Sequence, residues 1–452
     1  MGFFNQNFIR IITDDNDKKS YFCRMKKYCQ YILAFALLVA TTSVCTAQVC
    51  GCTDSLAINF DPGATVNDGG CVYATTIITA DGVGVLDPQL GNTSSFFYWE
   101  NGYWTNNDCY DSCLYKIDST DAEIVETLCF DGVYNYDTEE ITQDSLYLYF
   151  GDVGNNNGNR QDFKILRVNK ESILNQTVEI DTIWFSYEDQ TDFTYSPQAT
   201  DFDCEAFIVS DDSIYLFTKE WVSTQTTIYG IPKTPGTHVA HRLETYNVNG
   251  LVTGAAYMPE YQLVVLCGYD YDAVNVLSSL HPFVVLLYDF QEDRFFSGNK
   301  RRLDFDFSTR AQIEAIATHN ALDYYITNES TSVPVMDYYI DIPPVLQRLD
   351  LREYLLPYLS QYGISDNPDA VSNLSKEKFR IYPNPATDKL HIVCPQDFLG
   401  ADYEIFNLDG QKVAGGVLKE KIVLLNNNMP AGQYVLTIRK NGSLKSFKYI
   451  KR

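Results

Sequence analysis

The chain has 452 residues, of which 45% are hydrophobic, and this length suits two or three globular domains. Its formal net charge of −25 excludes a basic surface of the kind that binds nucleic-acid phosphates. Aromatic residues make up 14% of the chain, and 33 of them are tyrosines, which favour pleated, half-buried strands. The composition therefore predicts a mostly β protein that does not bind nucleic acid.

The N-terminal 47 residues have the pattern of an export signal. A basic start at Met25 precedes an apolar run over residues 31–44, which is too short to span a bilayer, and small residues follow as far as Ala47. We expect residues 1–47 to be a signal peptide whose true start is Met25. In an exported chain, spaced cysteines are disulfide candidates before they are metal ligands.

Changes in composition and in the density of strand and turn signals divide the rest of the chain into four segments. These are a short Cys-bracketed, Asp/Gly-rich repeat (48–73), a long run of short strands with turn signals (74–365), a Ser/Asn/Lys linker (366–378) and a compact strand-rich tail (379–452). No segment shows sustained helical periodicity. Residues 345–359 are the best helical candidate, with a strand followed by a short helix as the alternative.

Cys52 and Cys71 bracket the first segment, where Pro62 and a Gly-Gly pair supply turns. A disulfide between them would stabilise the loop by roughly 3 kcal/mol, which a segment without a core of its own needs. The stretch "GCTDSLAINFDPGATVNDGGCVY" resembles a small repeat of surface and secreted proteins in bacteria that use type IX secretion. The resemblance implies a location rather than an activity.

Three units of the long segment begin alike, with a glutamate, small or apolar residues, a turn and an aromatic-rich strand. The glutamates are Glu139 in "DTEEIT", Glu205 in "DCEAFI" and Glu314 in "QIEAIA". A fourth unit has Gly254 at this position, and a fifth, residues 94–108, is the least regular.

Further strands follow in each unit, so that four strands recur at a spacing of roughly 50 to 65 residues. This spacing predicts an all-β chain with a β-propeller of five blades, or six as the alternative. A strand over residues 75–82 precedes the first unit and is expected to complete the last blade.

The first strand of a propeller blade lines the central channel, so the three glutamates should be neighbours around one axis. Clustered carboxylates repel one another unless they are protonated, hydrogen-bonded or neutralised by a cation. One interpretation is a calcium ion, which takes carboxylate and carbonyl oxygens. The other is that the carboxylates accept backbone N–H bonds and pair with basic side chains, which holds the blades together.

The candidate residues follow from these two interpretations. The metal candidates are Glu139, Glu205, Glu314 and Asp152, with Asn107, Asp108, Asn155 and Glu329 in the same rows of sequence. The channel and ligand candidates also include Arg160 and Lys219, and Arg310 is a further pairing candidate.

The region as a whole resembles a family of exported bacterial propellers that is sometimes grouped with phytase-like or esterase-like propellers. The blocks that carry the resemblance include "WTNND", "LYFGDVGNNNGNR", "DCEAF", "FTKE" and "VTGAAY". The resemblance implies the fold and the channel but no reaction. Typical members read G-D-x-G-D-N where this chain has "GDVGNNNGN", so Asn155 replaces an acid and weakens the expectation of metal affinity.

The tail alternates apolar strands with "DG" and "NG" turns, which predicts a small antiparallel β-sandwich. Its blocks "IYPNPATDKLHIVC", "YEIFNLDGQKV" and "NMPAGQYVLTIRKNGSLKSFKYIKR" resemble the type A C-terminal sorting domain of type IX secretion, with Pro383, Asn384, Pro385 and Gly432 in the motif positions. The resemblance implies that the type IX machinery is a partner and that the protein reaches the cell surface or the medium.

Enzyme signatures are scarce. The chain has no G-x-S-x-G, H-E-x-x-H or G-x-x-x-x-G-K-[ST] motif. Cys109 and Cys113 could pair with each other, or one of them with Cys129. We therefore favour a surface protein whose channel face binds a ligand or partner, with calcium as a candidate cofactor. The alternative is a metal-dependent phosphate-ester or carboxyl-ester hydrolase.

Overall fold

The computed structural model describes most of the chain from residue 48 onward. The described residues are 48–108, 111–130, 136–271, 280–306, 309–335, 338–365, 380–382, 386–387, 389–393, 398–407, 411–419, 421–425, 429–440 and 443–452. The predicted signal peptide, the linker, Cys109 and the motif residues Pro383, Asn384 and Pro385 lie outside them.

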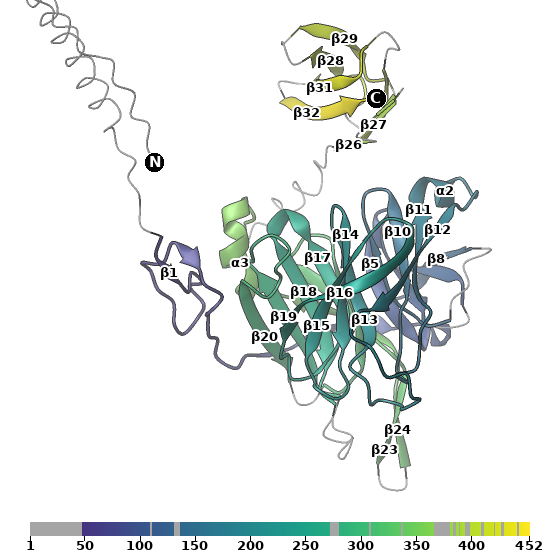
Figure 1. Ribbon diagram of the computed structural model, residues 1–452, viewed down its shortest axis with the longest axis vertical. Coiled ribbons are helices and arrows are strands. Elements are labelled where there is room, and N and C mark those ends of the chain that lie inside the picture. Colours follow the sequence, from purple (N-terminus) through teal and green to yellow (C-terminus); the bar gives the residue numbers. More distant parts are fainter. Residues whose placement is uncertain are drawn as a thin grey trace, which may run out of the picture.

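Five sheets, each with four antiparallel strands, make up the long middle segment (Figure 1). The first holds β5 (Thr93–Trp99), β6 (Gly102–Asn107), β7 (Cys113–Ile117) and β8 (Ile124–Cys129). The second holds β9 (Thr138–Gln143), β10 (Tyr147–Asp152), β11 (Phe163–Asn169) and β12 (Ile180–Tyr187). The third holds β13 (Asp203–Val209), β14 (Ser213–Lys219), β15 (Thr226–Pro232) and β16 (Gly236–Tyr246).

The remaining two sheets follow the same pattern. The fourth holds β17 (Leu251–Met258), β18 (Leu263–Tyr269), β19 (Pro282–Tyr288) and β20 (Asn299–Phe305). The fifth holds β21 (Ile313–Thr318), β22 (Asp323–Asn328), β25 (Val345–Asp350) and β4 (Asp81–Val85). The outer strands β12 and β16 pair in parallel, which joins the second and third sheets into one of eight strands.

The first strands of the five sheets form a closed ring. Contacts run from β5 to β9, β13, β17 and β21 in turn, and β21 returns to β5. An apolar cluster fills each of the five spaces between neighbouring sheets. The prediction of an all-β chain is confirmed, and we interpret this ring as the five-bladed form of the predicted propeller.

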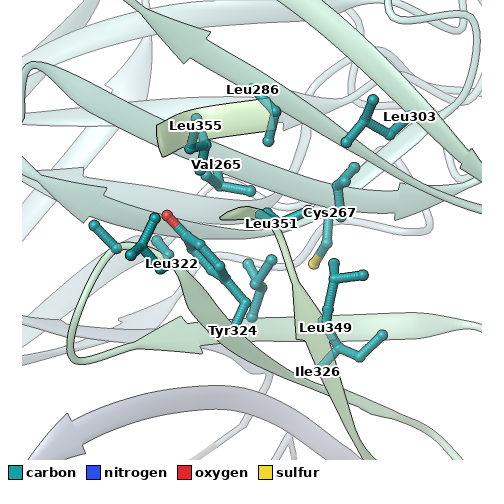
Figure 2. Packing of buried hydrophobic residues seen from close by; sticks show 14 of the residues in the cluster. Val265, Cys267, Leu286, Leu303, Leu322, Tyr324, Ile326, Leu349, Leu351 and Leu355 are labelled. Carbon is teal, nitrogen blue, oxygen red and sulfur yellow. The ribbon is translucent and has the colours of Figure 1, made fainter. Parts of the chain in front are cut away.

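Alternating residues of each strand supply two different clusters, because successive side chains point to opposite faces of the sheet and each face packs against a neighbouring sheet. Between the fourth and fifth sheets, Val265, Cys267 and Leu286 pack against Tyr324, Ile326 and Leu349, and Leu351 and Leu355 cover the cluster (Figure 2). Cys204 and Cys267 are buried free thiols among the described residues.

The ring is closed by a strand that comes before the first sheet in the sequence. β4 pairs with β25 and forms the outer strand of the fifth sheet. The sequence placed this strand at 75–82, whereas the structure divides the region, because β3 (Ile77–Ile78) pairs in parallel with β20 of the fourth sheet. Main-chain hydrogen bonds thus connect the start of the ring to its end.

Helices are few and short. α3 (Arg352–Leu359) directly follows β25, which agrees with the alternative of a strand plus a short helix, and α2 (Lys170–Leu174) follows β11. Single 3₁₀ turns are η1 (Pro88–Leu90), η2 (Pro259–Tyr261) and η4 (Ser360–Tyr362). Within the described residues, no helix has the length and apolar character that crossing a membrane requires.

The N-terminal repeat lies against the fourth sheet. Its strands β1 (Cys50–Gly51) and β2 (Val66–Asn67) are short, and the predicted disulfide between Cys52 and Cys71 is confirmed. The hydroxyls of Tyr73 and Tyr288 both donate to the carboxylate of Asp54, at 2.7 and 2.5 Å. These contacts attach a segment without a large core to a stable surface.

The tail forms two facing sheets. The smaller holds β26 (Arg380–Tyr382), β27 (Lys389–Val393) and β30 (Ile422–Leu424). The larger holds β28 (Asp402–Asn407), β29 (Lys412–Val417), β31 (Gly432–Lys440) and β32 (Ser443–Lys451). Leu390 and Val423 from one sheet share a core with Ile405 and Leu436 from the other, so the predicted antiparallel sandwich is present.

Candidate functional site

Each of the five inner strands carries a β-bulge near its start. The bulged residue is skipped in the pairing ladder, and such irregularities redirect a side chain. The five bulged residues, in order around the ring, are Ser94, Glu139, Glu205, Thr253 and Glu314. The three glutamates that the sequence aligned therefore occupy equivalent positions in three different sheets.

The fourth position of this ring differs from the sequence alignment. Thr253, and not Gly254, is the bulged residue of β17. Gly254 lies one residue further on, where a Cβ atom would come within 2.7 Å of the carbonyl oxygen of Glu314. The glycine is needed for this close approach of two strands, so its place in the sequence pattern reflects packing and not a lost carboxylate.

Lys219 and Glu205 form a buried ion pair at the centre of the site. The ammonium lies 2.6 Å from both carboxylate oxygens of Glu205, and the rings of Trp221 and Tyr269 lie 4.8 and 5.4 Å from it. Burial is the largest single effect and lowers the pKa of Lys219, but the charges of Glu205, Glu314 and Asp203 together with Tyr269 outweigh it and hold the pKa well above its ordinary value. Lys219 is thus charged, as a buried pair with full hydrogen bonding requires.

The other two glutamates of the ring are also buried. Burial raises the pKa of Glu314 well above its ordinary range; Lys219 opposes this shift, and a hydrogen bond with Glu205 adds to it. Burial likewise raises the pKa of Glu139, and the charges of Glu205 and Asp137 raise it further. These mutual effects place the three carboxyl groups near one another, although they lie on strands of three sheets.

Glu139 is also buried, with 8% of the residue exposed. It differs from its two counterparts because no described residue forms a hydrogen bond or an ion pair with its side chain. A Cβ atom at Gly154 would lie 2.4 Å from Oε1 of Glu139 and 2.3 Å from Oδ2 of Asp137. Both carboxyl groups therefore point toward the space beside Gly154. A buried carboxylate without partners is costly, which marks this position as unusual.

Half-buried carboxyl groups lie between this layer and the solvent. Burial and the charge of Asp203 raise the pKa of Asp137 to about 7. Burial and the charge of Asp108 raise the pKa of Glu329 to about 7. We call the whole set the acidic mouth: Asp108, Asp137, Glu139, Asp203, Glu205, Glu314 and Glu329, with Lys219 as the ammonium inside it.

Glu140 is the residue after Glu139 and crosses the ring, and we call it the floor of the mouth. Its carboxylate reaches past β13 to accept a hydrogen bond of 3.2 Å from the backbone nitrogen of Ala255 on β17. The residues at the same position of the other strands are small: Ser95, Ala206, Gly254 and Ala315. One long side chain thus crosses the ring where four short ones leave room.

Asp152 and Arg160 belong to a neighbouring ion-pair group and not to the mouth itself. Asp152 is bound by the guanidinium of Arg160 and, at 2.5 Å, by the ammonium of Lys164. Asn155 supports the loop between them, because its backbone nitrogen donates to Asp203 and its side-chain oxygen accepts from the backbone of Arg160. Arg160 also lies 3.9 Å from Asp137, which links the two groups.

Three of the four predicted calcium ligands are already engaged by other side chains. Glu205 uses both oxygens on Lys219, Asp152 is held by Arg160 and Lys164, and Glu314 bonds to Glu205. In the described residues, no three His, Cys, Asp or Glu side chains are grouped so that they could hold a metal ion. A calcium ion would have to displace an internal cation before these carboxylates could bind it.

The sequence did not place Asp137, Thr253 or Glu140 in the site. In two of the units, an aspartate stands two residues before the bulged glutamate, in Asp137-x-Glu139 and Asp203-x-Glu205. This repeated spacing could have added both aspartates to the predicted site. The second disulfide joins Cys113 to Cys129 across β7 and β8, which is one of the pairings left open. Gly432 lies at the start of β31 in the tail.

Comparison with protein families identifies the tail. Residues 380–452 match the family model described as "secretion system C-terminal sorting domain". The tail is a type IX secretion sorting domain. Because this domain directs passage across the outer membrane, the protein is exported to the cell surface or the extracellular space, and the type IX machinery recognises it.

Comparisons of the whole chain add little. No curated protein matches it. Among solved structures, it is similar to PorZ, a surface component of the type IX secretion system of Porphyromonas gingivalis, with 12% identity and a TM-score of 0.29 over 87% of this chain and 48% of that one. The computationally designed Ika8 protein gives 9% identity and a TM-score of 0.24 over 82% of this chain and 100% of that one. The chain spans about half the length of PorZ, and both TM-scores are too low to support an argument.

Proposed function

We propose that this exported protein is a binding protein and that its acidic mouth receives a positively charged ligand. Glu139 carries the proposal, because it is a buried carboxyl group that none of the described residues pairs with. A cation from outside the protein would supply the missing partner. The neighbouring carboxyl groups add to the attraction, since the mouth holds seven of them and the single ammonium of Lys219.

Burial raises the pKa of Glu139, Asp137 and Glu329, which favours their neutral forms in the unliganded mouth. A cation that enters would favour the charged forms of Glu139, Asp137 and Glu329, because an opposite charge nearby lowers a carboxyl pKa. The resulting charge-assisted contacts are stronger than neutral hydrogen bonds. The site therefore suits reversible binding of a cation better than permanent occupation.

The hydrolase alternative has less support. Holding a phosphate or carboxylate ester needs basic groups that are available to the substrate, whereas Lys219 is bound to Glu205 and Arg160 to Asp152. Activating a water molecule on a metal needs donors that converge, and those of Glu205 and Asp152 are already occupied. We therefore propose recognition without catalysis.

A thermal melt of the mature protein, residues 48–452, tests the proposal. The panel is calcium, magnesium, lysine amide and arginine amide, each with wild type, Glu139→Gln and Asp181→Asn. Asp181 is an exposed acid of β12 and controls for the general loss of one negative charge. We expect at least one cation to raise the Tm of wild type and of Asp181→Asn by several degrees but not that of Glu139→Gln. If no cation shifts the wild-type Tm, the mouth does not bind cations and the proposal is wrong.

A further inference from the structure

The ligand of the acidic mouth can be assigned more closely. Resting on the proposed function, we infer that it is a protonated amine or guanidinium carried by a partner polypeptide, so that a lysine or arginine side chain enters the mouth. Three independent observations lead to this ligand class: the internal ammonium, the closed floor and the hairpin beside the mouth.

Lys219 shows which cation this environment accommodates. Its ammonium is bound by a carboxylate and faces the rings of Trp221 and Tyr269 at 4.8 and 5.4 Å. Carboxylates combined with aromatic faces bind organic cations well. A divalent metal instead needs oxygens that converge on one point, and the described side chains form no such group. The chemistry around Lys219 therefore favours a second nitrogen cation next to Glu139.

The floor limits how far a ligand can enter. Glu140 extends across the ring to Ala255 on a strand that is not adjacent to its own. Above it, Glu139 and Glu314 are buried, whereas Asp137 and Glu329 are half-buried. A side chain that enters from the solvent thus meets the half-buried acids first and Glu139 last. This order suits a single flexible side chain that ends in a charge.

A hairpin next to the mouth offers a surface for the rest of a polypeptide. β23 (Thr331–Val335) and β24 (Tyr338–Ile342) follow Glu329 directly and project beyond the sheets (Figure 1). The Thr331 hydroxyl donates to Gln312, whose amide in turn donates to Glu314 at 3.4 Å, so the base of the hairpin is connected to the ring. Tyr339 is 74% exposed and Ile340 is 54% exposed. These two exposed side chains of β24 could contact a peptide backbone and its neighbouring side chains, whereas a metal ion would not contact them.

Calorimetric titration of the mature protein, residues 48–452, tests this inference with five probes. These are a blocked Gly-Lys-Gly peptide, its arginine and norleucine counterparts, the polyamine spermidine, and calcium. We expect the lysine or arginine peptide to bind, the uncharged norleucine peptide not to bind, and Glu139→Gln to weaken binding by roughly tenfold or more through loss of a charge-assisted contact. Asp181→Asn should bind like wild type.

A second variant tests whether the partner is a polypeptide. Tyr339→Ala removes an exposed side chain that belongs to none of the apolar clusters of the described residues. It should weaken binding of a longer lysine peptide, such as a ten-residue one, and leave the affinity for Gly-Lys-Gly unchanged. Binding of spermidine without binding of any peptide would overturn the assignment to a polypeptide.

The two proposals fail in different ways. If calcium binds in a manner that depends on Glu139 and the basic peptides do not, this inference is wrong while cation recognition at the mouth stands. If none of the five probes binds, both are wrong. Equal binding of the lysine and norleucine peptides would show that the contact is apolar and would also overturn the inference.

Discussion

At the scale of single residues, the charge of the acidic mouth depends on which of its carboxyl groups hold a proton. The pKa values of Asp137 and Glu329 are about 7, whereas the same groups ionise near their ordinary values of 3.8 and 4.5 in an unfolded chain. Between those values and pH 7 the folded protein holds protons that the unfolded chain has released. The stability that these two carboxyl groups contribute is therefore fully present below about pH 4 and is lost as the pH rises through about 7.

This linkage gives a prediction for the protein without ligand. We expect the free energy of unfolding of residues 48–452 to fall between pH 5 and pH 8 on account of these two groups, by about 5 kcal/mol at most. The double variant Asp137→Asn, Glu329→Gln should show a flatter dependence, and Asp181→Asn should keep the wild-type slope. Urea unfolding at several pH values measures the effect. A double variant with an unchanged slope would mean that neither carboxyl group holds its proton in the folded state.

At the scale of elements, the inner strands are joined by hydroxyl groups as well as by apolar packing. The Thr253 hydroxyl donates to the carbonyl of Ile313 on β21, the residue before Glu314. The Ser94 hydroxyl donates to the carbonyl of Thr138 on β9, the residue before Glu139, at 2.6 Å. Ser94 and Thr253, the two bulged residues that are not glutamates, thus each form a hydrogen bond with the neighbouring strand beside its bulged glutamate. These bonds hold the backbone next to the bulge.

Removing one of these hydroxyls tests their contribution. Thr253→Val keeps the shape of a fully buried side chain but leaves a buried carbonyl with one partner fewer. We expect a loss of about 1–3 kcal/mol in the free energy of unfolding, measured in urea. Thr253→Ser keeps the hydroxyl and should lose less. A valine variant as stable as wild type would show that packing alone joins the fourth and fifth sheets.

At the scale of the whole molecule, three parts with different sources of stability are joined in one chain. The ring has an apolar cluster between each pair of neighbouring sheets, and the tail has its own core. The N-terminal repeat instead depends on the Cys52–Cys71 disulfide and on polar contacts with the fourth sheet, such as those of Asn67 with Asp289 and Asn299. Loss of the repeat should therefore leave the ring folded.

The double variant Cys52→Ser, Cys71→Ser examines this independence. Without the disulfide, we expect residues 48–73 to become sensitive to limited proteolysis, because roughly 3 kcal/mol of loop-closure stabilisation is lost. The main thermal transition of the ring should stay within a few degrees of wild type. Wild-type protein under the same conditions is the control. If the repeat of the variant resisted cleavage, its contacts with Tyr288 and Asp289 would be sufficient without the bond.

The sequence by itself determined the features that local pattern encodes. These are the all-β class, the repeated Glu139, Glu205 and Glu314 units, the Cys52–Cys71 pairing and the sandwich of the tail, because strand alternation, turn residues and cysteine spacing depend on near neighbours in the chain. The assignment of the tail as a sorting domain came from its resemblance to that family. The sequence offered Lys219, Arg160 and Arg310 as partners for the glutamates, and the structure pairs Lys219 with Glu205 across adjacent strands of one hairpin.

Only the tertiary structure decided which distant groups meet. A one-residue bulge placed Thr253 in the ring in place of Gly254, and only the closed ring brought Glu140 to Ala255, 115 residues away in sequence. Among the residues that the structure describes, it also gave Glu139 no hydrogen-bond or ion-pair partner, whereas Glu205 pairs with Lys219, although the two glutamates occupy the same position in their strands. The physical reason is that burial and charge depend on all the groups that surround a site, and strands from five sheets supply them here.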